Sequence, residues 1–365
     1  MINVFGSSDS KEVQAMHIHA INLPRFVIVG DNVLPKIDEL LSRLLVREDV
    51  LLVRGEGFTK SPASLVKDYV AEMGLPVHEV CVPAPTVDVV SAVECAIKET
   101  RSCMVISVGG GKIIDVAKIA SHRQGIPFIS IPTSAAHDGI ASPIASIKDG
   151  KTSMSVMAQP PVALLADIQI ISNSPRRFII SGCGDIIAKF TAVRDWRLAH
   201  RLRGEYYGEY AASLALMSAQ LLKRNVDLIA RGLEVGVRTI IEALISCGYA
   251  MCIAGSSRPC SGSEHLFSHA LEKVSKNGSL HGEKCGVGTI MMMYMHGGDW
   301  QSIKAVLSKI GAPTTARQLG VSDEDVLEAL TIAHTMRPDR YTILGESGIS
   351  RKAAEDLARI TGVID

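Results

Sequence analysis

The chain has 365 residues, 47% hydrophobic and 21% charged, so it can bury the cores of two ordinary domains without long disordered segments. Its 38 Lys and Arg residues balance its 38 Asp and Glu residues, and the net charge is zero. This balance argues against an electrostatic binder of nucleic acid or a polybasic membrane protein. It favours an enzyme that acts on a small molecule.

Residues 1–14 lack a basic segment followed by an apolar core and a cleavage site, so no signal peptide is predicted. Eight scattered cysteines form no CxxC pair and are expected to be reduced, mostly buried thiols in the cytoplasm. The most apolar later stretch, residues 239–255, contains Glu242 and is short for a bilayer span. We therefore predict a buried helix there and no membrane span.

Five short β-branched runs alternate with helical patterns in the first half of the chain. The predicted strands end near Gly30, Gly55, Pro83, Gly109 and Thr133. The amphipathic segments between them predict helices over residues 33–45, 64–74, 86–100 and 112–123. Strands and helices that alternate at this spacing favour a Rossmann-like parallel α/β sheet, covered by helices on both faces.

The fourth predicted strand leads into Gly109, Gly110 and Gly111, and a helix follows them. Glycines allow backbone amides to approach a phosphate group at the positive end of that helix. The pattern is neither GxGxxG nor a P-loop, because Lys112 follows the third glycine and the GKS/T ending is missing. A tight turn alone would explain it, but its place at the carboxyl end of a strand favours a ligand site.

The next strand ends in a polar loop, PTSAAHDGIASP. If the strand order is sequential, this loop lies at the same sheet edge as the glycines. A loop capped by Asp and Ser would explain the same residues without a ligand. The candidate site residues in this loop are Thr133, Ser134, His137, Asp138 and Ser142.

Long segments with helical apolar spacing follow residue 174, with few strand signals. Asn173, Ser174 and Pro175 are typical of a helix start. The sequence therefore predicts an α/β domain over residues 1–173 and an all-α domain over residues 174–365. The active site is expected in the cleft between them.

Asp185 follows two glycines, Gly182 and Gly184, and leads into an apolar segment. One interpretation makes it the N-cap of a helix. The other makes it a metal ligand facing the cleft. One carboxylate and two imidazoles leave coordination positions open for a substrate oxygen.

Three of the eleven histidines fall within residues 260–286. His265 and His269 are four residues apart in a helical pattern and lie on one face, and His281 follows a turn signalled at residues 277–278. The three imidazoles can converge on a metal ion or an anionic substrate, although a lone buried histidine is more often a core residue. The HLFSH pattern lacks the glutamate of an HExxH metalloprotease. The spacing leaves open whether His265 or His269 is the ligand.

Several stretches of the chain resemble the sn-glycerol-1-phosphate dehydrogenase family, which belongs to the superfamily of glycerol dehydrogenase, iron-containing alcohol dehydrogenase and dehydroquinate synthase. In chain order they are GGGKIIDVAK, PTSAAHDGIASP, GCGDIIAKFTA, SGSEHLFSHALE, HGEKCGVGT, GAPTTARQLGV and MRPDRYTIL. The resemblance covers nearly the whole chain. It implies a Zn²⁺-dependent oxidoreductase that transfers hydride from NAD(P)H to C2 of dihydroxyacetone phosphate, yielding sn-glycerol 1-phosphate for archaeal-type ether lipids.

The resemblance also implies roles for individual residues. Asp185, His265 and His281 would hold the catalytic Zn²⁺, and Asp185 would also face the substrate. Asp138 and His269 would contact the substrate as orienting or proton-relay groups.

Further implied contacts concern the phosphate group and the cofactor. Arg258 occupies a place where a related synthase has a phosphate-binding arginine; a surface charge after a flexible GSS is the alternative. Glu56 would suit the ribose of NAD(H), whereas Arg54 and Lys60 would suit the 2′-phosphate of NADP(H), so both cofactors stay open. The residues implied to contact the cofactor are Gly109, Gly110, Gly111, Asp115, Thr133, Ser134 and Ser142.

Three other interpretations compete with this one. Glycerol dehydrogenase or a dehydroquinate synthase-like enzyme would share the fold, the metal and the nicotinamide site. A non-catalytic nucleotide-sensing protein would bind the cofactor without turnover. A zinc-free structural cluster would explain the histidines without catalysis. The apolar surface of the helical half is also sufficient for a homo-oligomer.

Overall fold

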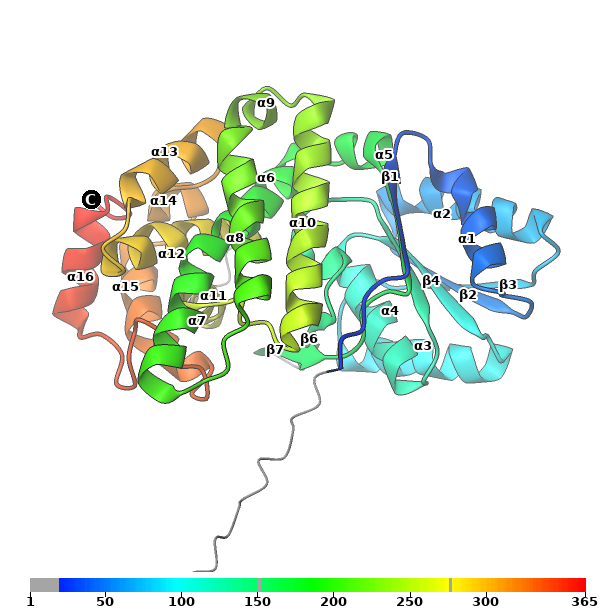
Figure 1. The fold of residues 1–365 in the computed structure, drawn as a ribbon, viewed down its shortest axis with the longest axis horizontal. Coiled ribbons are helices and arrows are strands. Elements are labelled where there is room, and N and C mark those ends of the chain that lie inside the picture. Colours follow the sequence, from blue (N-terminus) through cyan, green and yellow to red (C-terminus); the bar gives the residue numbers. More distant parts are fainter. Residues whose placement is uncertain (1–19, 150–151, 276–277) are drawn as a thin grey trace, which may run out of the picture.

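The computed structural model describes residues 20–149, 152–275 and 278–365. Residues 1–14, for which no signal peptide is predicted, lie outside the described residues. Asn277 of the predicted turn also lies outside them. Among the described residues, the strands and first helices form one part of the molecule and the later helices form another (Figure 1).

A six-stranded parallel sheet forms the centre of the first part. Its spatial order is β3, β2, β4, β5, β8 and β1. The five predicted strands are all present. The strands are β1 (Phe26–Gly30), β2 (Val50–Arg54), β3 (Val77–Cys81), β4 (Met104–Gly109), β5 (Phe128–Pro132) and β8 (Ala163–Asp167).

Strand β8 and a small hairpin are absent from the sequence prediction. β8 is fully buried between β1 and β5, so the strand order is not sequential. Its apolar run continues directly into a short helix, and no glycine or proline marks its end. Asp167 makes this transition by accepting hydrogen bonds from the backbone amides of Gln169 and Ile170. The hairpin pairs β6 (Ile144–Asp149) with β7 (Thr152–Met157).

Helices cover both faces of the sheet, as predicted. In β2, Val50 and Leu52 pack towards α1 and α2, whereas Leu51 and Val53 pack towards α3 and α4. This alternation follows from the period of two in a strand, and burial on both faces explains the continuous apolar runs. The bounds are η1 (Leu34–Lys36), α1 (Ile37–Arg43), η2 (Gly57–Thr59), α2 (Lys60–Glu72), α3 (Val87–Thr100) and α4 (Gly111–Arg123).

The second part is helical, and its first long helix begins at Arg176, directly after the predicted helix-start signal. A short helix, η3 (Asp138–Ile140), lies earlier in the chain, after β5. The elements of the second part follow it. They are α5 (Ile168–Ser172), α6 (Arg176–Ile187), α7 (Lys189–Arg203), α8 (Glu209–Arg224), α9 (Val226–Ala230), α10 (Glu234–Ala254), α11 (Ser263–Val274), α12 (His281–Met295), α13 (Trp300–Ile310), α14 (Ala316–Leu319), α15 (Asp323–Ile332), η4 (Ala333–Met336) and α16 (Arg351–Ile360). The predicted fold class is therefore confirmed.

Helix α10 stands between the sheet and the outer helices (Figure 1) and packs against α6, α8 and η3. Within the described residues, it alone is long and apolar enough to cross a membrane by length and composition. However, 67% of its most apolar window is buried inside the protein, which is typical of a core helix. The prediction of a buried helix is confirmed.

The cysteines are all free. Cys81 and Cys95 are exposed and Cys103 is half-buried, whereas the other five are buried. The prediction of unpaired, mostly buried thiols is therefore confirmed.

The carboxyl edge of the sheet brings the two predicted loops together. β3, which follows β2 in the chain, is the edge strand on one side of β2. The next strand, β4, pairs with the other side of β2, so the order of the strands reverses there. Such a reversal is where open α/β sheets bind ligands. Gly109 at the end of β4 lies opposite Pro132 at the end of β5, so the loops that follow are neighbours. The expectation of a shared edge is correct although the full strand order is not sequential.

Candidate active site

The glycine turn between β4 and α4 is packed against the loop that follows β5. A Cβ atom on Gly111 would lie 1.9 Å from His137 Nε2, and one on Gly110 would lie 3.1 Å from Ser134 Oγ. Gly110 is the N-cap of α4, so this contact also fixes the helix N-terminus at the sheet edge. The turn has the arrangement that allows backbone amides to approach a phosphate group.

The remaining predicted cofactor residues surround this turn and have protein partners. The backbone amide of Thr133 donates to Gly109 O at 3.0 Å, and Ser142 Oγ donates to Ile144 O at 3.2 Å. Asp115 is buried and accepts from Lys118 Nζ at 3.2 Å and from the backbone amide of Ser146 at 2.9 Å. The Asp115 carboxylate therefore links α4 to β6, and its predicted cofactor contact stays a prediction.

Charged groups that could distinguish NAD(H) from NADP(H) follow β2. Glu56 and Lys60 are exposed. Arg54 donates to Glu79 at 2.5 Å and to the Cys81 sulfur at 3.3 Å. Arg54 is thus held by β3, and Glu56 and Lys60 are the freer candidates for contact with the ribose.

The N-cap interpretation of Asp185 is wrong, because Asp185 lies in the last turn of α6. The glycines before it serve close packing instead. A Cβ atom on Gly182 would lie 2.0 Å from Ala135 O, and one on Gly184 would lie 2.1 Å from Gly282 O in α12. These contacts bring the loop after β5, α6 and α12 together around Asp185.

Replacing Gly182 with alanine is expected to lower the free energy of unfolding by about 2 kcal/mol, because the new methyl group overlaps a backbone oxygen. Urea unfolding of the purified variant measures this loss. Gly286→Ala in α12 is the matched control, since its nearest neighbour would lie 3.4 Å away and alanine favours a helix. Equal stability of the two variants would contradict the close packing of the loop on α6.

Three helices bring the predicted metal ligands together. Asp185 comes from α6, His265 from α11 and His281 from the start of α12. His265 Nε2 lies 3.5 Å from Asp185 Oδ1, and the His265 and His281 ring centroids are 4.9 Å apart. A carboxylate and two imidazoles at this separation form a suitable donor set for a divalent transition metal.

Glu264 orients His265 towards the other two side chains. The Glu264 carboxylate accepts from His265 Nδ1 at 2.7 Å, from Thr191 Oγ1 at 2.6 Å and from the backbone amide of Gly262 at 2.7 Å. With Nδ1 engaged, Nε2 is the nitrogen that faces Asp185, an arrangement common in carboxylate–histidine–metal sites. This geometry supports His265, rather than His269, as the ligand.

The ionisation of Asp185 and His281 favours metal binding. Burial acts to raise the pKa of Asp185, but Lys189, His265 and His281 oppose it and hold that pKa well below its usual range. Burial and the charge of His265 hold the pKa of His281 well below its usual value, so His281 is neutral. An ionised carboxylate and a neutral imidazole are the forms that bind metal ions. Burial acts to lower the pKa of His265, but Cys285, Asp185 and Glu264 raise it well above its usual value, so His265 must release a proton when a metal binds.

Lys189 is a further residue at this site that was not predicted from the sequence. It is fully buried, and its ammonium group lies 2.7 Å from Asp185 Oδ1 and 2.8 Å from Asp138 Oδ2. Burial acts to lower the pKa of Lys189, but the two carboxylates raise it well above its usual value. The spacing of four residues from Asp185 on a continuing helical pattern was the signal available in the sequence.

Asp138 joins the sheet edge to the helical part. Its backbone amide donates to Asp185 Oδ2 at 2.8 Å, and its own carboxylate accepts from Lys189. The Asp138 side chain is 16% exposed, so a small molecule can reach it. The predicted substrate-binding aspartate therefore lies beside the metal ligands.

His269 lies one helical turn beyond His265, with its ring centroid 6.1 Å from that of His281. Burial, followed by the charge of His265, lowers the pKa of His269 to about 4. A neutral imidazole can donate one hydrogen bond and accept another. It is thus suited to contact a substrate hydroxyl or carbonyl group next to the metal ligands.

Cys285 is a second residue that sequence reasoning missed. It lies one turn after His281 in α12, is fully buried, and its sulfur is 3.6 Å from His281 Nε2. His265, His281 and Cys285 hold ligand atoms within 4.8 Å of one another. A thiolate is a good ligand for zinc, so Cys285 is an alternative third ligand to Asp185.

The structure does not support either interpretation of Arg258. The residue is 4% exposed, so it is not a surface charge. Its guanidinium group pairs with Glu205 through Nε at 2.5 Å and through Nη2, and Nη1 donates to Tyr341 O at 3.0 Å. Because Glu205 neutralises this arginine, it is a poor candidate for binding the substrate phosphate.

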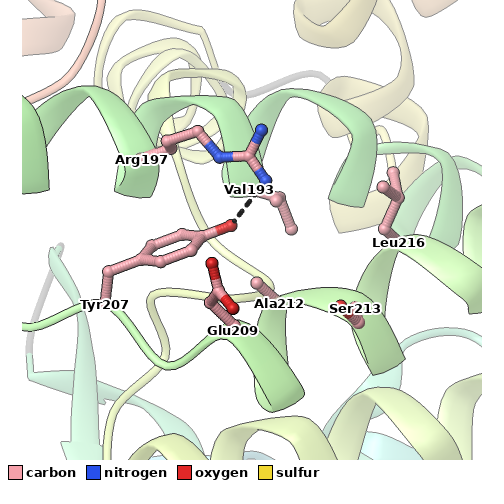
Figure 2. Close-up of a pocket in the computed structure, with 7 residues that line it drawn as sticks. All are labelled: Val193, Arg197, Tyr207, Glu209, Ala212, Ser213 and Leu216. Carbon is pink, nitrogen blue, oxygen red and sulfur yellow. Dashed lines mark hydrogen bonds between the residues drawn. The ribbon is translucent and has the colours of Figure 1, made fainter.

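A separate hollow lies between α7 and α8 (Figure 2). Arg197 donates to the Tyr207 hydroxyl there at 3.1 Å, and its guanidinium lies over the Tyr207 ring. None of the predicted site residues lines this hollow. The candidate active site is therefore the set of groups around Asp185.

Comparisons with known proteins agree with the fold. A sequence model of the iron-containing alcohol dehydrogenase family matches residues 28–175. The crystal structure of a probable glycerol dehydrogenase from Sinorhizobium meliloti has a TM-score of 0.77 at 20% identity, over 94% of this chain and 97% of that one. Sulfoacetaldehyde reductase from Bifidobacterium kashiwanohense, solved in complex with NAD⁺, has a TM-score of 0.73 at 18% identity, over 95% and 100%.

The sequence relatives are much closer. Glycerol-1-phosphate dehydrogenase (NAD(P)+) from Pyrococcus furiosus is 52% identical over 347 residues, which cover 95% of this chain and all of the relative. The enzyme of the same name from Aeropyrum pernix is 51% identical over 95% of this chain and 99% of its own length. With this identity over nearly the whole length, the chain belongs to the glycerol-1-phosphate dehydrogenase family.

Proposed function

We propose that this protein reduces dihydroxyacetone phosphate to sn-glycerol 1-phosphate with NADH or NADPH, and that Zn²⁺ is its metal. The observation that carries the proposal is the meeting of Asp185, His265 and His281 with Asp138 from the sheet edge. The names of the close relatives support the same reaction. The product would serve as the backbone of archaeal-type ether phospholipids.

Each part of the site contributes a separate element of this reaction. Bound at Asp185, His265 and His281, a divalent metal would supply the positive charge that stabilises developing charge on the C2 oxygen. Asp138 and His269 would orient the substrate and exchange a proton with it. The turn at residues 109–111 would hold the cofactor pyrophosphate at the α4 N-terminus, so that hydride passes between the nicotinamide ring and C2.

We also propose that the two domains bind different ligands. Residues 1–173 would bind the dinucleotide, and residues 174–365 would bind metal and substrate. A cytoplasmic homo-oligomer is proposed as the working form. Glu56 and Lys60 together suit both NAD(H) and NADP(H), in line with the NAD(P)+ in the relatives' names.

The purified protein is expected to oxidise NADH or NADPH in the presence of dihydroxyacetone phosphate. Activity should disappear after removal of metal by a chelator, because the metal supplies several kcal/mol of charge stabilisation, and should return with Zn²⁺. Absorbance at the nicotinamide band follows the reaction. Chiral analysis of the product should give sn-glycerol 1-phosphate.

Glycerol with NAD⁺ is the control substrate, because it lacks the phosphate group. Greater turnover of glycerol than of glycerol phosphate would move the assignment to glycerol dehydrogenase. A folded, metal-loaded protein that binds the cofactor but turns over neither substrate would contradict the proposal and favour a nucleotide sensor.

A further inference from the structure

Arg340 is a buried cation that is held by neutral oxygen acceptors. It is 9% exposed, and its guanidinium group donates to Ser261 O at 2.6 Å and to Ser257 Oγ at 2.8 Å. No carboxylate of the described residues lies within ion-pair distance of it. Burial of an unpaired charge is costly, so a buried arginine in this state indicates an anion that is absent from the protein chain itself.

Arg337 lies close to Arg340 and likewise forms no ion pair with any described carboxylate. Burial, followed by the charges of Arg337 and Arg258, lowers the pKa of Arg340 to about 9. Asp339 and Glu205 oppose this decrease in the pKa of Arg340, and Glu205 is already paired with Arg258. Two of the three guanidinium groups in this cluster therefore lack a carboxylate of their own.

This cluster adjoins the candidate active site. Helix η4, which ends next to Arg337, packs against α11, the helix that carries His265 and His269. Through Ser261, Arg340 also contacts the loop that leads into the first turn of α11. An anion held by both arginines would therefore lie near the first turn of α11, the helix that carries His265 and His269.

We propose that Arg337 and Arg340 bind the phosphate group of the substrate and select phosphorylated over unphosphorylated trioses. This inference rests on the proposed function and replaces Arg258 as the phosphate-binding residue. The planar guanidinium group suits a phosphate dianion, since it offers parallel N–H donors at fixed spacing. Three of the five Arg340 donors have no acceptor among the residues that the structure describes, which leaves room for such contacts.

The test compares Arg337→Gln and Arg340→Met with Arg317→Gln, an exposed arginine in α14 that forms no ion pair with a described residue. Steady-state kinetics with dihydroxyacetone phosphate should show KM raised about tenfold to a hundredfold in each cluster variant, because one charged hydrogen-bonding group is lost. The KM for the nicotinamide cofactor and the low activity on dihydroxyacetone should stay unchanged. Arg317→Gln should match the wild type.

A second measurement separates binding from folding. Inorganic phosphate should raise the melting temperature of the wild type and of Arg317→Gln, and the rise should be lost in both cluster variants. Without phosphate, Arg337→Gln should be at least as stable as the wild type, since it relieves repulsion. Arg340→Met removes the donor from Ser257 Oγ, which is buried, and from Ser261 O, so its phosphate response, not its absolute stability, is the relevant value.

The outcomes distinguish this inference from the proposed function. If the wild type does not reduce dihydroxyacetone phosphate, the proposed function fails. If the wild type is active and prefers the phosphorylated substrate, but both cluster variants keep the wild-type KM and the phosphate-induced rise in melting temperature, the proposed function stands and this inference is overturned.

Discussion

Replacing His265 with alanine is expected to remove the bound metal and to lower kcat/KM for dihydroxyacetone phosphate by at least about 10³-fold. A loss of this size corresponds to about 4 kcal/mol of transition-state stabilisation, which is what a metal supplies when it stabilises charge on a carbonyl oxygen. His265 is the expected ligand because Glu264 engages Nδ1 and leaves Nε2 facing Asp185 at 3.5 Å.

Metal content per chain, measured after dialysis, and steady-state kinetics check this prediction together. His122→Ala is the control, because His122 is exposed at the end of α4 and lies outside the candidate site. Full retention of the metal by His265→Ala would contradict the assignment. In that case His281 and Cys285, whose sulfur is 3.6 Å from His281 Nε2, would be the ligand pair to examine.

The sequence alone predicted the strands whose ends carry a clear signal. Five strands ended at glycine, proline or threonine signals, and all five are present in the sheet. β8 was missed because its apolar run passes without a break into α5, and the switch is made by Asp167, which ends the strand and caps the helix. Local pattern carries no information on such a strand until its partners in the sheet are known.

The sequence predicted which residues form the site, but not how the elements that carry them pack together. Asp185 was recognised, yet its glycines suggested a helix start, whereas they allow α6 to meet α12 and the loop after β5. Gly182 meets Ala135 and Gly184 meets Gly282, so these contacts join residues far apart in the chain, beyond the reach of a local pattern. The same limit applies to Arg258, because Glu205, its partner, lies 53 residues away.

By contrast, neighbours of the predicted ligands on the same helical pattern could have been predicted from their four-residue spacing. Lys189 is four residues after Asp185, and Cys285 is four residues after His281. Both pairs are neighbours in the structure. A search for charged or ligand side chains at this spacing from each predicted ligand would have found them.

Replacing Lys189 with methionine is expected to lower the free energy of unfolding of the metal-free protein by about 3 kcal/mol. The change leaves the Asp138 and Asp185 carboxylates close together without their shared ammonium group, and breaking a buried ion pair from one side costs about 3–5 kcal/mol. In the metal-loaded protein the loss should be smaller, because the cation supplies positive charge to Asp185. Metal binding should therefore stabilise the variant more than it stabilises the wild type.

Urea unfolding of the metal-free and metal-loaded forms, followed by circular dichroism, measures both differences. Lys118→Met is the matched control: Lys118 is equally buried and pairs with Asp115, away from the metal ligands. Its loss of stability should be the same with and without metal. If Lys189→Met behaves in the same way, the Lys189 charge is not coupled to the metal site. A stability loss that metal partly restores in Lys189→Met alone would show that Lys189 takes the place of the cation between the two carboxylates when the metal is absent.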